Sequence, residues 1–523
     1  MTDAIVIGAG INGLAAAATL ALKGWKVAVF ERSGRPGGAA KTLELTLPGF
    51  RHDWGALNLS LFAGSAFHQQ NAGLLAEHGL EFVPAKDCFS SAFPDGRWLG
   101  VSTDPAITTA RIAGFSRADA AAWQAMLAAF GADAPHIFAV LGSPMTPRSA
   151  LHTAWKIWRA RNAAFLARLV RLLIQTPRAF LDEHFESDHV KATLAAWGMH
   201  LDFPPDQAGG ALFPYLEAMA NQSFGMVIGK GGADSMIGAL VRLIEARGGT
   251  VECGVAVTGV TTAAGAATGV TLADGRTVKA RRAVIANTTP RALVDGLPGG
   301  TSGRSAYDAG ARAFRHGPGT MMLHLAMDGL PDWAAGAELK RFAYVHLAPS
   351  LRQMANAYTD AMAGLLPAEP VLVVGQPTAI DPSRAPAGKH TLWVQVRVVP
   401  GTIKGDAAGV IAATDWAGAK EAMAERVLDI IERYAPGTRG KILGRAVVSP
   451  AELEADNPNL VGGDQISGSH HPSQNFLFRP VTGWSDWTTP VSRLYHVGAS
   501  TWPGAGVGAG SGSMLAERIA RRR

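Results

Sequence analysis

The stretch that most constrains the fold of this chain is AIVIGAGINGLAAAATLAL, residues 4–22, which contains no charged side chain. Its length is close to that of a membrane-spanning helix. Gly8, Gly10 and Gly13 stand at G-x-G-x-x-G spacing between a β-branched run and an alanine-rich run. Since a lipid-exposed helix tolerates such a break poorly, the stretch predicts a buried strand, a tight turn and a helix instead of a membrane span.

The residues that follow complete a strand–helix–strand unit. WKVAVFER predicts a second strand that ends near Glu31, about 20 residues after the glycines. We expect Gly8 to allow the tight turn and Gly10 to let the backbone approach a pyrophosphate. Gly13 then lets the helix pack closely on the strand, and Glu31 binds ribose hydroxyls. NAD, NADP and FAD enzymes all use this turn, so it predicts a dinucleotide site without choosing the cofactor.

The bulk properties exclude several other classes of protein. The 523 residues are enough for two intertwined globular domains. Cys88 and Cys253 form no C-x-x-C motif, and no His/Cys cluster has ligand spacing, so we expect neither a disulfide nor a metal site. The net charge is +6, but the basic residues are dispersed, so no nucleic-acid partner is expected. The first strand begins next to the initiator methionine, which leaves no room for a signal peptide and predicts a cytoplasmic protein.

The residues after Glu31 resemble the FAD-dependent phytoene desaturases, a carotenoid-desaturase-like branch of the flavin amine oxidase superfamily. RSGRPGGAAKT contains the pair Gly37–Gly38, and GFRHDWGA contains Asp53 and Gly55, in the order and spacing of that family. The resemblance implies that both loops line FAD. Many members carry Arg directly after the glycine pair, where this chain has two alanines and then Lys41. Whether Lys41 supplies the positive charge near the pyrophosphate is left open.

The resemblance covers most of the chain. GKGGADSMIGALVRLIEARGGTVECGVAVTGV is similar to the family segment whose backbone, near Val257, holds the adenine. GVTLADGRTVKARRAVIANTTP is similar to a β-meander that returns to the nucleotide domain around Asn287. DPSRAPAGKHTLWVQVRVVP, Gln474 and Arg479–Pro480 also match this branch.

The C-terminal stretch LYHVGASTWPGAGVGAGSGSMLAERIARR predicts a strand that ends near Val497, a glycine-rich turn and a helix that begins near Val507. In the family, amides near Gly506 and Val507 face the N1/O2 edge of the flavin, where a helix N-terminus stabilises negative charge. A second nucleotide loop for NAD(P)H is the alternative, but no second complete βαβ fingerprint occurs. We therefore expect the electrons to leave to O₂, a quinone or another protein.

The motifs and the resemblance together give one set of candidate cofactor-binding residues: Gly8, Gly10, Ile11, Asn12, Gly13, Glu31, Arg32, Gly37, Gly38, Ala39, Lys41, Asp53, Trp54, Gly55, Val257, Asn287, Gly498, Ser500, Gly506 and Val507. The catalytic candidates are His470 and His471 in SGSHHPSQNFLFRP, which the family brings near the flavin and which could accept a proton at neutral pH. A surface turn is the alternative for this pair. His52 and Asp53 are also open to a structural interpretation, holding the cofactor loop.

The expected fold is α/β: a Rossmann-type FAD-binding domain of the two-dinucleotide-binding-domain flavoprotein kind, with a discontinuous α+β substrate domain. We assign residues 1–75, 225–300 and 440–523 to the FAD-binding domain. Residues 76–224 and 301–439, rich in Ala, Leu, Phe and Trp, form the substrate domain. A pocket between two such domains suits catalysis.

One helical segment, residues 151–173, combines aromatic and basic side chains. At helical spacing one face carries apolar side chains, broken only by Asn162; they are Leu151, Trp155, Trp158, Phe165, Leu169 and Leu172. The other side carries Lys156, Arg159, Arg168 and Arg171. Two interpretations are open: a contact with a membrane or partner, peripheral to the inner face of the membrane, or an apolar stripe packed on its own domain.

The resemblance implies an FAD-dependent oxidoreductase that transfers a hydride from a hydrophobic small molecule to flavin N5, as in desaturation. The flavin supplies the difficult chemistry, so no acid–base triad is required. The alternatives are an amine oxidase that uses O₂, with Trp484 and Trp487 as an aromatic cage, a redox-neutral flavin-dependent isomerase, and a non-catalytic flavin-bearing scaffold.

Overall fold

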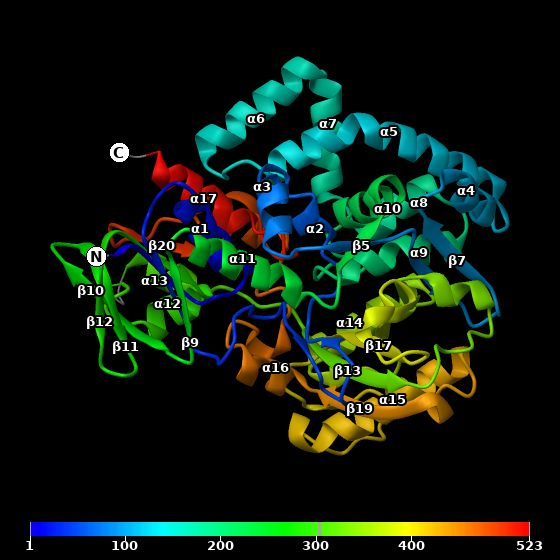
Figure 1. Ribbon diagram of the computed structural model, residues 1–523. Coiled ribbons are helices and arrows are strands. Elements are labelled where there is room, and N and C mark those ends of the chain that lie inside the picture. The colour runs from blue at the N-terminus through cyan, green and yellow to red at the C-terminus, as the bar shows by residue number, and fades with distance from the viewer. Residues whose placement is uncertain (1, 302–304, 522–523) are drawn as a thin grey trace.

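The computed structural model describes residues 2–301 and 305–521, and it contains two seven-stranded sheets (Figure 1). The first sheet has the order β10–β11–β12–β1–β2–β9, with β20 also paired to β12. Its strands are β1 (Thr2–Ile7), β2 (Val27–Glu31), β9 (Thr250–Cys253), β10 (Val257–Ala263), β11 (Ala266–Leu272), β12 (Thr277–Asn287) and β20 (Leu494–Val497). The run β20, β12, β1, β2, β9 is parallel, as expected for a Rossmann-type sheet.

Three helices cover this sheet, and two of them meet at their N-terminal turns. They are α1 (Ile11–Leu22), α11 (Asp234–Ala246) and α17 (Gly510–Ala520). A Cβ on Gly512 would lie 1.8 Å from the backbone oxygen of Asn12, so α17 approaches α1 backbone to backbone. The first and last helices of the described chain therefore begin beside each other.

The uncharged stretch that opens the chain is buried inside this layer. It forms β1 and α1, whose side chains are almost all sealed from solvent, so the prediction of a strand, a turn and a helix is confirmed. Among the described residues one helix, α5 (Arg117–Leu141), is long and apolar enough to cross a membrane by length and composition. Trp123, Met126 and Phe130 of α5 pack into a hydrophobic core of the protein.

The second sheet is mixed and has the order β19–β13–β17–β16–β14–β6–β7. Its strands are β6 (Asp87–Ala92), β7 (Trp98–Ser102), β13 (Gly319–Met327), β14 (Tyr344–Leu347), β16 (Val371–Gly375), β17 (His390–Val399) and β19 (Ile442–Val448). Side chains alternate between its two faces. One face, with Leu323, Val345 and Val394, packs under α15 (Trp416–Tyr434).

The two sheets draw their strands from different parts of the chain. The strands of the first sheet come from residues 2–31, 250–287 and 494–497, all inside the segments assigned to the FAD-binding domain. β19 differs, because Ile442–Val448 pairs with β13 of the second sheet although it lies in the segment 440–523. Sheet membership thus changes after Val448 and not at residue 440.

The remaining elements are mostly helices, some packed on the first sheet and others on the substrate side. They are α2 (Ser60–Ala63), α3 (Ala66–Glu77), α4 (Pro105–Ala113), α6 (Pro147–Ala160), α7 (Ala163–Ile174), α8 (Pro177–His184), α9 (Asp188–Met199), α10 (Leu212–Phe224), α12 (Pro290–Gly296), α13 (Ala306–Arg312), α14 (Leu351–Ala363) and α16 (Pro450–Asp456). Short strand pairs join β3 (Thr42–Leu43) to β4 (His52–Asp53), β5 (Phe82–Ala85) to β8 (Met226–Gly229), and β15 (Leu365–Leu366) to β18 (Gly405–Asp406).

The amphipathic segment 151–173 is two helices and not one. Asn162 caps the N-terminus of α7 by accepting a hydrogen bond from the backbone of Phe165 at 2.8 Å. α6 and α7 form a projection at the top of the molecule in Figure 1. Phe165 is buried in the core, whereas Trp155 and Trp158 on α6 are each 49% exposed. The prediction of one continuous apolar face along this segment is therefore wrong, because the chain turns at Arg161–Asn162 between the two helices.

Candidate functional site

The glycine-rich turn between β1 and α1 has no room for side chains. Gly8 has a φ of +90°, which favours glycine, and a Cβ on Gly13 would lie 2.3 Å from the oxygen of Gly8. Gly10 is the N-cap residue of α1 and provides no side-chain acceptor. Ile11 and Asn12 open the helix, so their amides point to the sheet edge where an anion would bind.

Glu31 lies at the end of β2, next to this turn. One carboxylate oxygen accepts a hydrogen bond from the amide of Ala9 at 2.8 Å, and the other accepts from Ser33. Gly37 donates to the oxygen of Ala9, and a Cβ on Gly38 would lie 3.4 Å from the Cα of Gly10. The structure thus brings the first glycines, the acid and the glycine pair together.

Three other candidates lie around this cluster. Arg32 is exposed beside Glu31. The segment that leads into β10 lies beside Glu31, because the amide of Val255 donates a hydrogen bond to the backbone oxygen of Glu31. Val257 is the first residue of β10. Asn287, at the end of β12, lies within the turn, since a Cβ on Gly10 would be 2.9 Å from its Nδ2 atom.

Lys41 is buried and ion-paired. Its Nζ atom lies 2.5 Å from a carboxylate oxygen of Asp456 on α16 and 5.5 Å from the ring centre of Trp54. Asp456 compensates its charge, so Lys41 ties the cofactor loop to α16. The alternative role, a free positive charge at the pyrophosphate, finds no support in this pairing.

Asp53 holds two loops together inside the protein. It accepts hydrogen bonds from the Thr42 hydroxyl at 2.7 Å and from the amide of Ala233 at 2.8 Å, and it forms a buried ion pair with Arg384. Ala233 belongs to the GKGG turn before α11. This geometry matches the structural interpretation of Asp53.

The residues around Asp53 extend the same loop. His52 accepts or donates a hydrogen bond with Thr46 at 2.8 Å, and burial lowers its pKa to about 4. A Cβ on Gly55 would lie 3.0 Å from the oxygen of Ala39, so the loop packs against the segment after the glycine pair. Trp54 stacks on His324 of the second sheet with ring centres 6.4 Å apart.

The C-terminal glycine-rich turn closes over the same sheet edge. The amide of Gly498 donates to Ser511 on α17, and the hydroxyl of Ser500 donates to the oxygen of Ser467 at 2.8 Å. Gly506 has a φ of +117°, and a Cβ there would lie 2.4 Å from Leu61. Val507 also adopts a left-handed φ, of +61°.

The predicted start of the last helix is wrong by three residues. α17 begins at Gly510 and not near Val507. Val507 and Ala509 both have left-handed backbone angles, which a helix cannot include. The strand prediction ending at Val497 is confirmed.

His470 and His471 lie on one loop but have different surroundings. Nε2 of His470 accepts a hydrogen bond from the amide of Ala505 at 3.1 Å, and burial holds the pKa of His470 well below its usual range. Its ring therefore supports the C-terminal turn as a neutral group. His471 lies 3.3 Å from a carboxylate oxygen of Asp202 and is half-buried. A catalytic role for either histidine stays a prediction.

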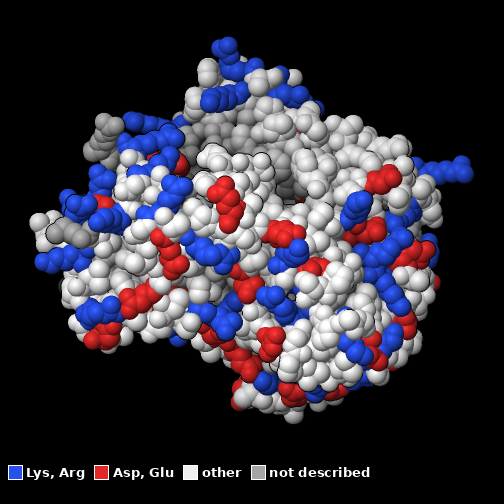
Figure 2. Space-filling model, viewed as in Figure 1, with Lys and Arg blue, Asp and Glu red and all other residues white. Residues whose placement is uncertain are grey.

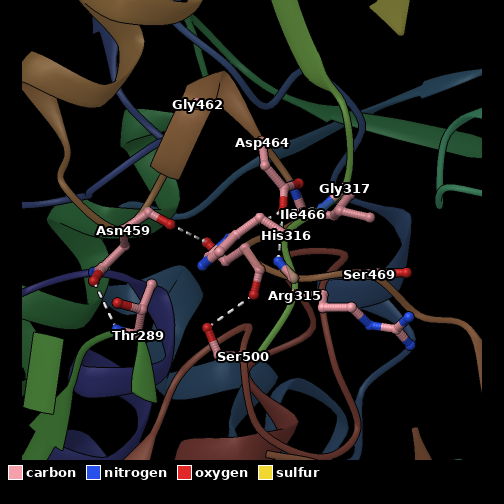
Figure 3. Close-up of polar contacts among 12 residues, drawn as sticks. Thr289, Arg315, His316, Gly317, Asn459, Gly462, Asp464, Ile466, Ser469 and Ser500 are labelled. Carbon is pink, nitrogen blue, oxygen red and sulfur yellow. Dashed lines mark hydrogen bonds and ion pairs between the residues drawn. The ribbon is translucent and has the colours of Figure 1, made fainter. Parts of the chain in front are cut away.

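Asp464 and Asn459 organise this loop, and the sequence motifs did not single them out. Figure 3 shows the carboxylate of Asp464 beside His316 and Gly317, and it accepts hydrogen bonds from the amides of Gly317 at 2.9 Å and Gly468 at 2.7 Å. Asn459 accepts from the amide of Thr289 at 2.9 Å. The only signal for them is their position in the loop before the histidine pair.

The inner face of the second sheet is polar and aromatic, and it packs on the cofactor loop. Across β13, β17 and β14 it carries one row with His324, Trp393 and Tyr344. Along β17, Gln395 and Arg397 follow Trp393 at every second position, so their side chains lie on the same inner face of the sheet. Trp393 and Tyr344 stack with ring centres 5.8 Å apart.

Several buried polar atoms on this face have no partner within the described residues. They include both ring nitrogens of His324, Nε1 of Trp393, Nδ1 of His346 and Nε of Arg397. Burial lowers the pKa of Arg397 to about 10. Buried polar groups are normally hydrogen-bonded, so a face with such gaps is a candidate for binding a ligand or water.

The tryptophans considered for an aromatic cage lie elsewhere. Trp487 is buried against α1 and α17 and donates to the oxygen of Trp502 at 3.1 Å. Trp484 packs edge-on against Tyr307 under the first sheet. The two rings belong to different hydrophobic clusters and form no common cage. Within the described ranges there is also no group of three metal-ligating side chains.

Comparisons with known proteins agree with this geometry. A family model described as an NAD(P)-binding Rossmann-like domain matches residues 6–70. The chain is 29% identical to the rat (Rattus norvegicus) protein called pyridine nucleotide-disulfide oxidoreductase domain-containing protein 2, over 99% of this chain and 93% of that one. It is 25% identical to the phytoene desaturase (neurosporene-forming) of Cereibacter sphaeroides, over 96% of this chain and 91% of that protein.

Among solved structures, cyclohexylamine oxidase from Brevibacterium oxydans IH-35A has the same fold, with a TM-score of 0.59 at 17% identity, over 100% of this chain and 99% of that one. The side-chain-free turns at Gly8, Gly10 and Gly506 and the acid at Glu31 fit FAD. The chain is an FAD-dependent oxidoreductase related to the phytoene desaturases.

Proposed function

We propose that this protein removes two hydrogens from adjacent carbons of a hydrophobic substrate, as a desaturase does. The observation that carries the proposal is the packing of the second sheet's inner face on the cofactor loop, through Trp54 and His324. Large aromatic side chains on that face, Trp393 and Tyr344, suit an apolar substrate. The phytoene desaturase relatives support the same substrate class.

When bound, FAD supplies the hydride acceptor. The chain's own residues would hold and shield it. The amides at the start of α1 and the turn at Gly8 and Gly10 would hold the diphosphate, and Glu31 would hold the ribose. The turn at Gly506 and Val507, supported by His470, would offer backbone amides to the flavin ring. The second sheet excludes water from the space between them.

The direct test is anaerobic mixing of FAD-loaded protein with vesicles that carry phytoene, followed by absorbance. Bleaching of the flavin, with a desaturated product in the extract, is the expected result. Bleaching by an amine panel together with hydrogen peroxide release in air would favour the amine oxidase instead. A flavin that no vesicle or amine reduces would contradict the proposal. With the substrate present, O₂, a quinone and a partner protein are then compared as electron acceptors.

We further propose that the protein is cytoplasmic and docks on an anionic membrane surface through α6. Three apolar side chains of α6 are exposed to solvent: Leu151, which is 72% exposed, and the tryptophans Trp155 and Trp158. Lys156 and Arg159 are exposed beside them, and Figure 2 shows basic side chains gathered on this projection. Aromatic and basic side chains on one exposed helix suit the interface of an anionic bilayer.

The docking test replaces both tryptophans together, as Trp155→Ser with Trp158→Ser. Burying each indole stabilises binding by roughly 1.5–3 kcal/mol, so affinity for phosphatidylglycerol vesicles should fall at least tenfold in co-sedimentation. Val410→Ser is the matched control, because Val410 is 78% exposed on a different part of the chain. Equal binding by the double variant and the parent would contradict docking through α6.

A further inference from the structure

A small cavity lies between the inner face of the second sheet and the loop that contains Asp464. Its volume is about 10 Å³, which is space for one water-sized group. Thr320 of β13 and Arg397 of β17 line it from the sheet. The loop lines it with Asp464, Gln465 and Ile466. A group held in this cavity therefore contacts both the sheet and the loop.

Arg397 places a buried guanidinium group at the cavity. The residue is 6% exposed, and its Nη2 atom donates to the backbone oxygens of Met199, at 3.2 Å, and of His200. Among residues 2–301 and 305–521, its Nε atom has no partner and its guanidinium group forms no ion pair. By contrast, Arg384, which is also sealed from solvent, pairs with two aspartates. Buried donors normally have an acceptor, so the Nε atom of Arg397 is available to a ligand.

Gln465 supplies a second donor to the same cavity. Its Oε1 atom accepts a hydrogen bond from Nε2 of Gln395 on β17. Its own Nε2 atom is sealed from solvent and has no partner in the part of the chain that the structure describes. Two unpartnered donors that line one water-sized space favour an occupant that accepts hydrogen bonds.

The carboxylates in the cavity wall already have hydrogen-bond partners. Asp464 accepts from the amide of Gly317 at 2.9 Å, and Figure 3 shows its carboxylate beside Gly317. Asp202, which also lines the cavity, accepts from the hydroxyl of Tyr358 at 2.9 Å and lies 3.3 Å from Nε2 of His471. Two carboxylates in the wall repel an anion. The cavity therefore suits a neutral oxygen, such as that of a carbonyl or hydroxyl group.

The loop that lines the cavity also holds the C-terminal glycine-rich turn. The hydroxyl of Ser500, in that turn, donates to the backbone oxygen of Ser467 at 2.8 Å, and Ser467 follows Ile466 (Figure 3). On the sheet side, Trp393 lies on the same face of β17 as Arg397, four residues earlier. The cavity therefore lies between the face proposed for the substrate and the turn assigned to the flavin.

We propose that this cavity binds one neutral oxygen of the substrate, so that Arg397 and Gln465 select a hydrophobic molecule with a carbonyl or hydroxyl group. The inference rests on the proposed desaturation and narrows its substrate class. The apolar chain of the substrate lies along Trp393, and its oxygen accepts hydrogen bonds from Nε of Arg397 and Nε2 of Gln465. A pure hydrocarbon leaves both donors without an acceptor and binds more weakly.

The first test measures binding alone, by tryptophan fluorescence of the FAD-loaded protein. The probes are tridecane, 2-tridecanone and tridecanoate, which share one chain length and are delivered from cyclodextrin. Because a buried donor without an acceptor weakens binding roughly tenfold or more, the ketone should bind at least tenfold more tightly than the alkane. Tridecanoate should bind more weakly than the ketone, because the two carboxylates repel it. Equal or undetectable binding of ketone and alkane would overturn the proposal and leave the cavity to a water molecule. Tightest binding by tridecanoate would overturn it too.

The second test assigns the hydrogen bonds to the two donors. Gln465→Met removes the Nε2 atom at similar side-chain length, and Arg397→Lys keeps the charge but removes the Nε atom. Infrared difference spectra of 2-tridecanone with a ¹³C-labelled carbonyl follow the C=O stretch, which moves to lower wavenumber when the oxygen accepts a hydrogen bond. We expect this shift in the parent and a smaller shift in each variant. Gln70→Met makes the same change at an exposed position of α3 and should keep the full shift. An identical shift in the parent and in both cavity variants would overturn the proposal.

Flavin bleaching by phytoene-loaded vesicles separates this inference from the proposed function. Bleaching together with equal binding of ketone and alkane would overturn the oxygen site and leave desaturation intact. A preference for the ketone that Gln465→Met abolishes, in a protein whose flavin phytoene does not reduce, would support the oxygen site and count against the proposed function.

Discussion

The edge of the first sheet and the inner face of the second sheet offer a ligand different kinds of contact. At the first, contacts come from backbone, because Gly8, Gly10 and Gly506 leave no space for side chains. At the second, they come from side chains such as Trp393 and Arg397 on one face of β17. A backbone site fixes the shared cofactor, whereas a side-chain site can vary with the substrate.

Breaking the connection between the two regions should have the largest effect. Arg384, from the segment before β17, pairs inside the protein with Asp53 of the cofactor loop, and both are sealed from solvent. Arg384→Met leaves the Asp53 charge buried without its partner, which typically costs about 3–5 kcal/mol. Urea unfolding should show this loss.

The control for that experiment is Arg276→Gln, which removes an exposed ion pair with Glu252 and should leave the unfolding midpoint almost unchanged. A small effect of Arg384→Met would mean that the two regions are stable without their buried ion pair.

Separating the two helix starts within the first region should have the next largest effect. Gly512→Val places a side chain 1.8 Å from the backbone oxygen of Asn12, which cannot move without shifting α1. We expect a loss of about 3 kcal/mol, at the upper end for overpacking, together with loss of FAD during purification. Thermal unfolding and flavin absorbance measure both. Gly34→Ala meets nothing within 4 Å and should behave like the parent.

A pH series tests the side-chain region alone. Because the pKa of Glu217 is raised from 4.5 to about 7 in the folded protein, its contribution is present below pH 4.5 and is lost as pH rises through 7. Glu217→Gln should match the parent at pH 4 and be more stable by about 2–3 kcal/mol at pH 8. Urea unfolding at both pH values is the measurement, and a gap that does not change with pH would contradict the burial of this acid.

The first region could be predicted from the sequence because glycine spacing directly encodes a backbone shape. Gly8, Gly10, Gly13 and Glu31 occupy the strand, turn and helix positions that the motif requires. The predicted start of α17 was wrong because nothing in the sequence indicates the left-handed backbone angles of Val507 and Ala509. The amphipathic segment was taken as one helix because helical spacing carries no information about a turn capped by Asn162.

The second region could not be predicted, because its members are assembled by pairing between distant strands. Tyr344 and Trp393 meet through β16, which separates β14 from β17. His324 joins the same row from β13, which pairs with β17. Period-two alternation predicts a buried face but not which polar side chains occupy it.

The most direct test of the account is the FAD content of the purified protein, measured by absorbance after release of the cofactor. The parent should carry about one FAD per chain, because both helix starts contribute to one site. Gly10→Val, at the first turn, and Gly506→Val, at the last, should each lose most of it. A colourless parent protein that takes up no added FAD would contradict the account, and so would full FAD content in both variants.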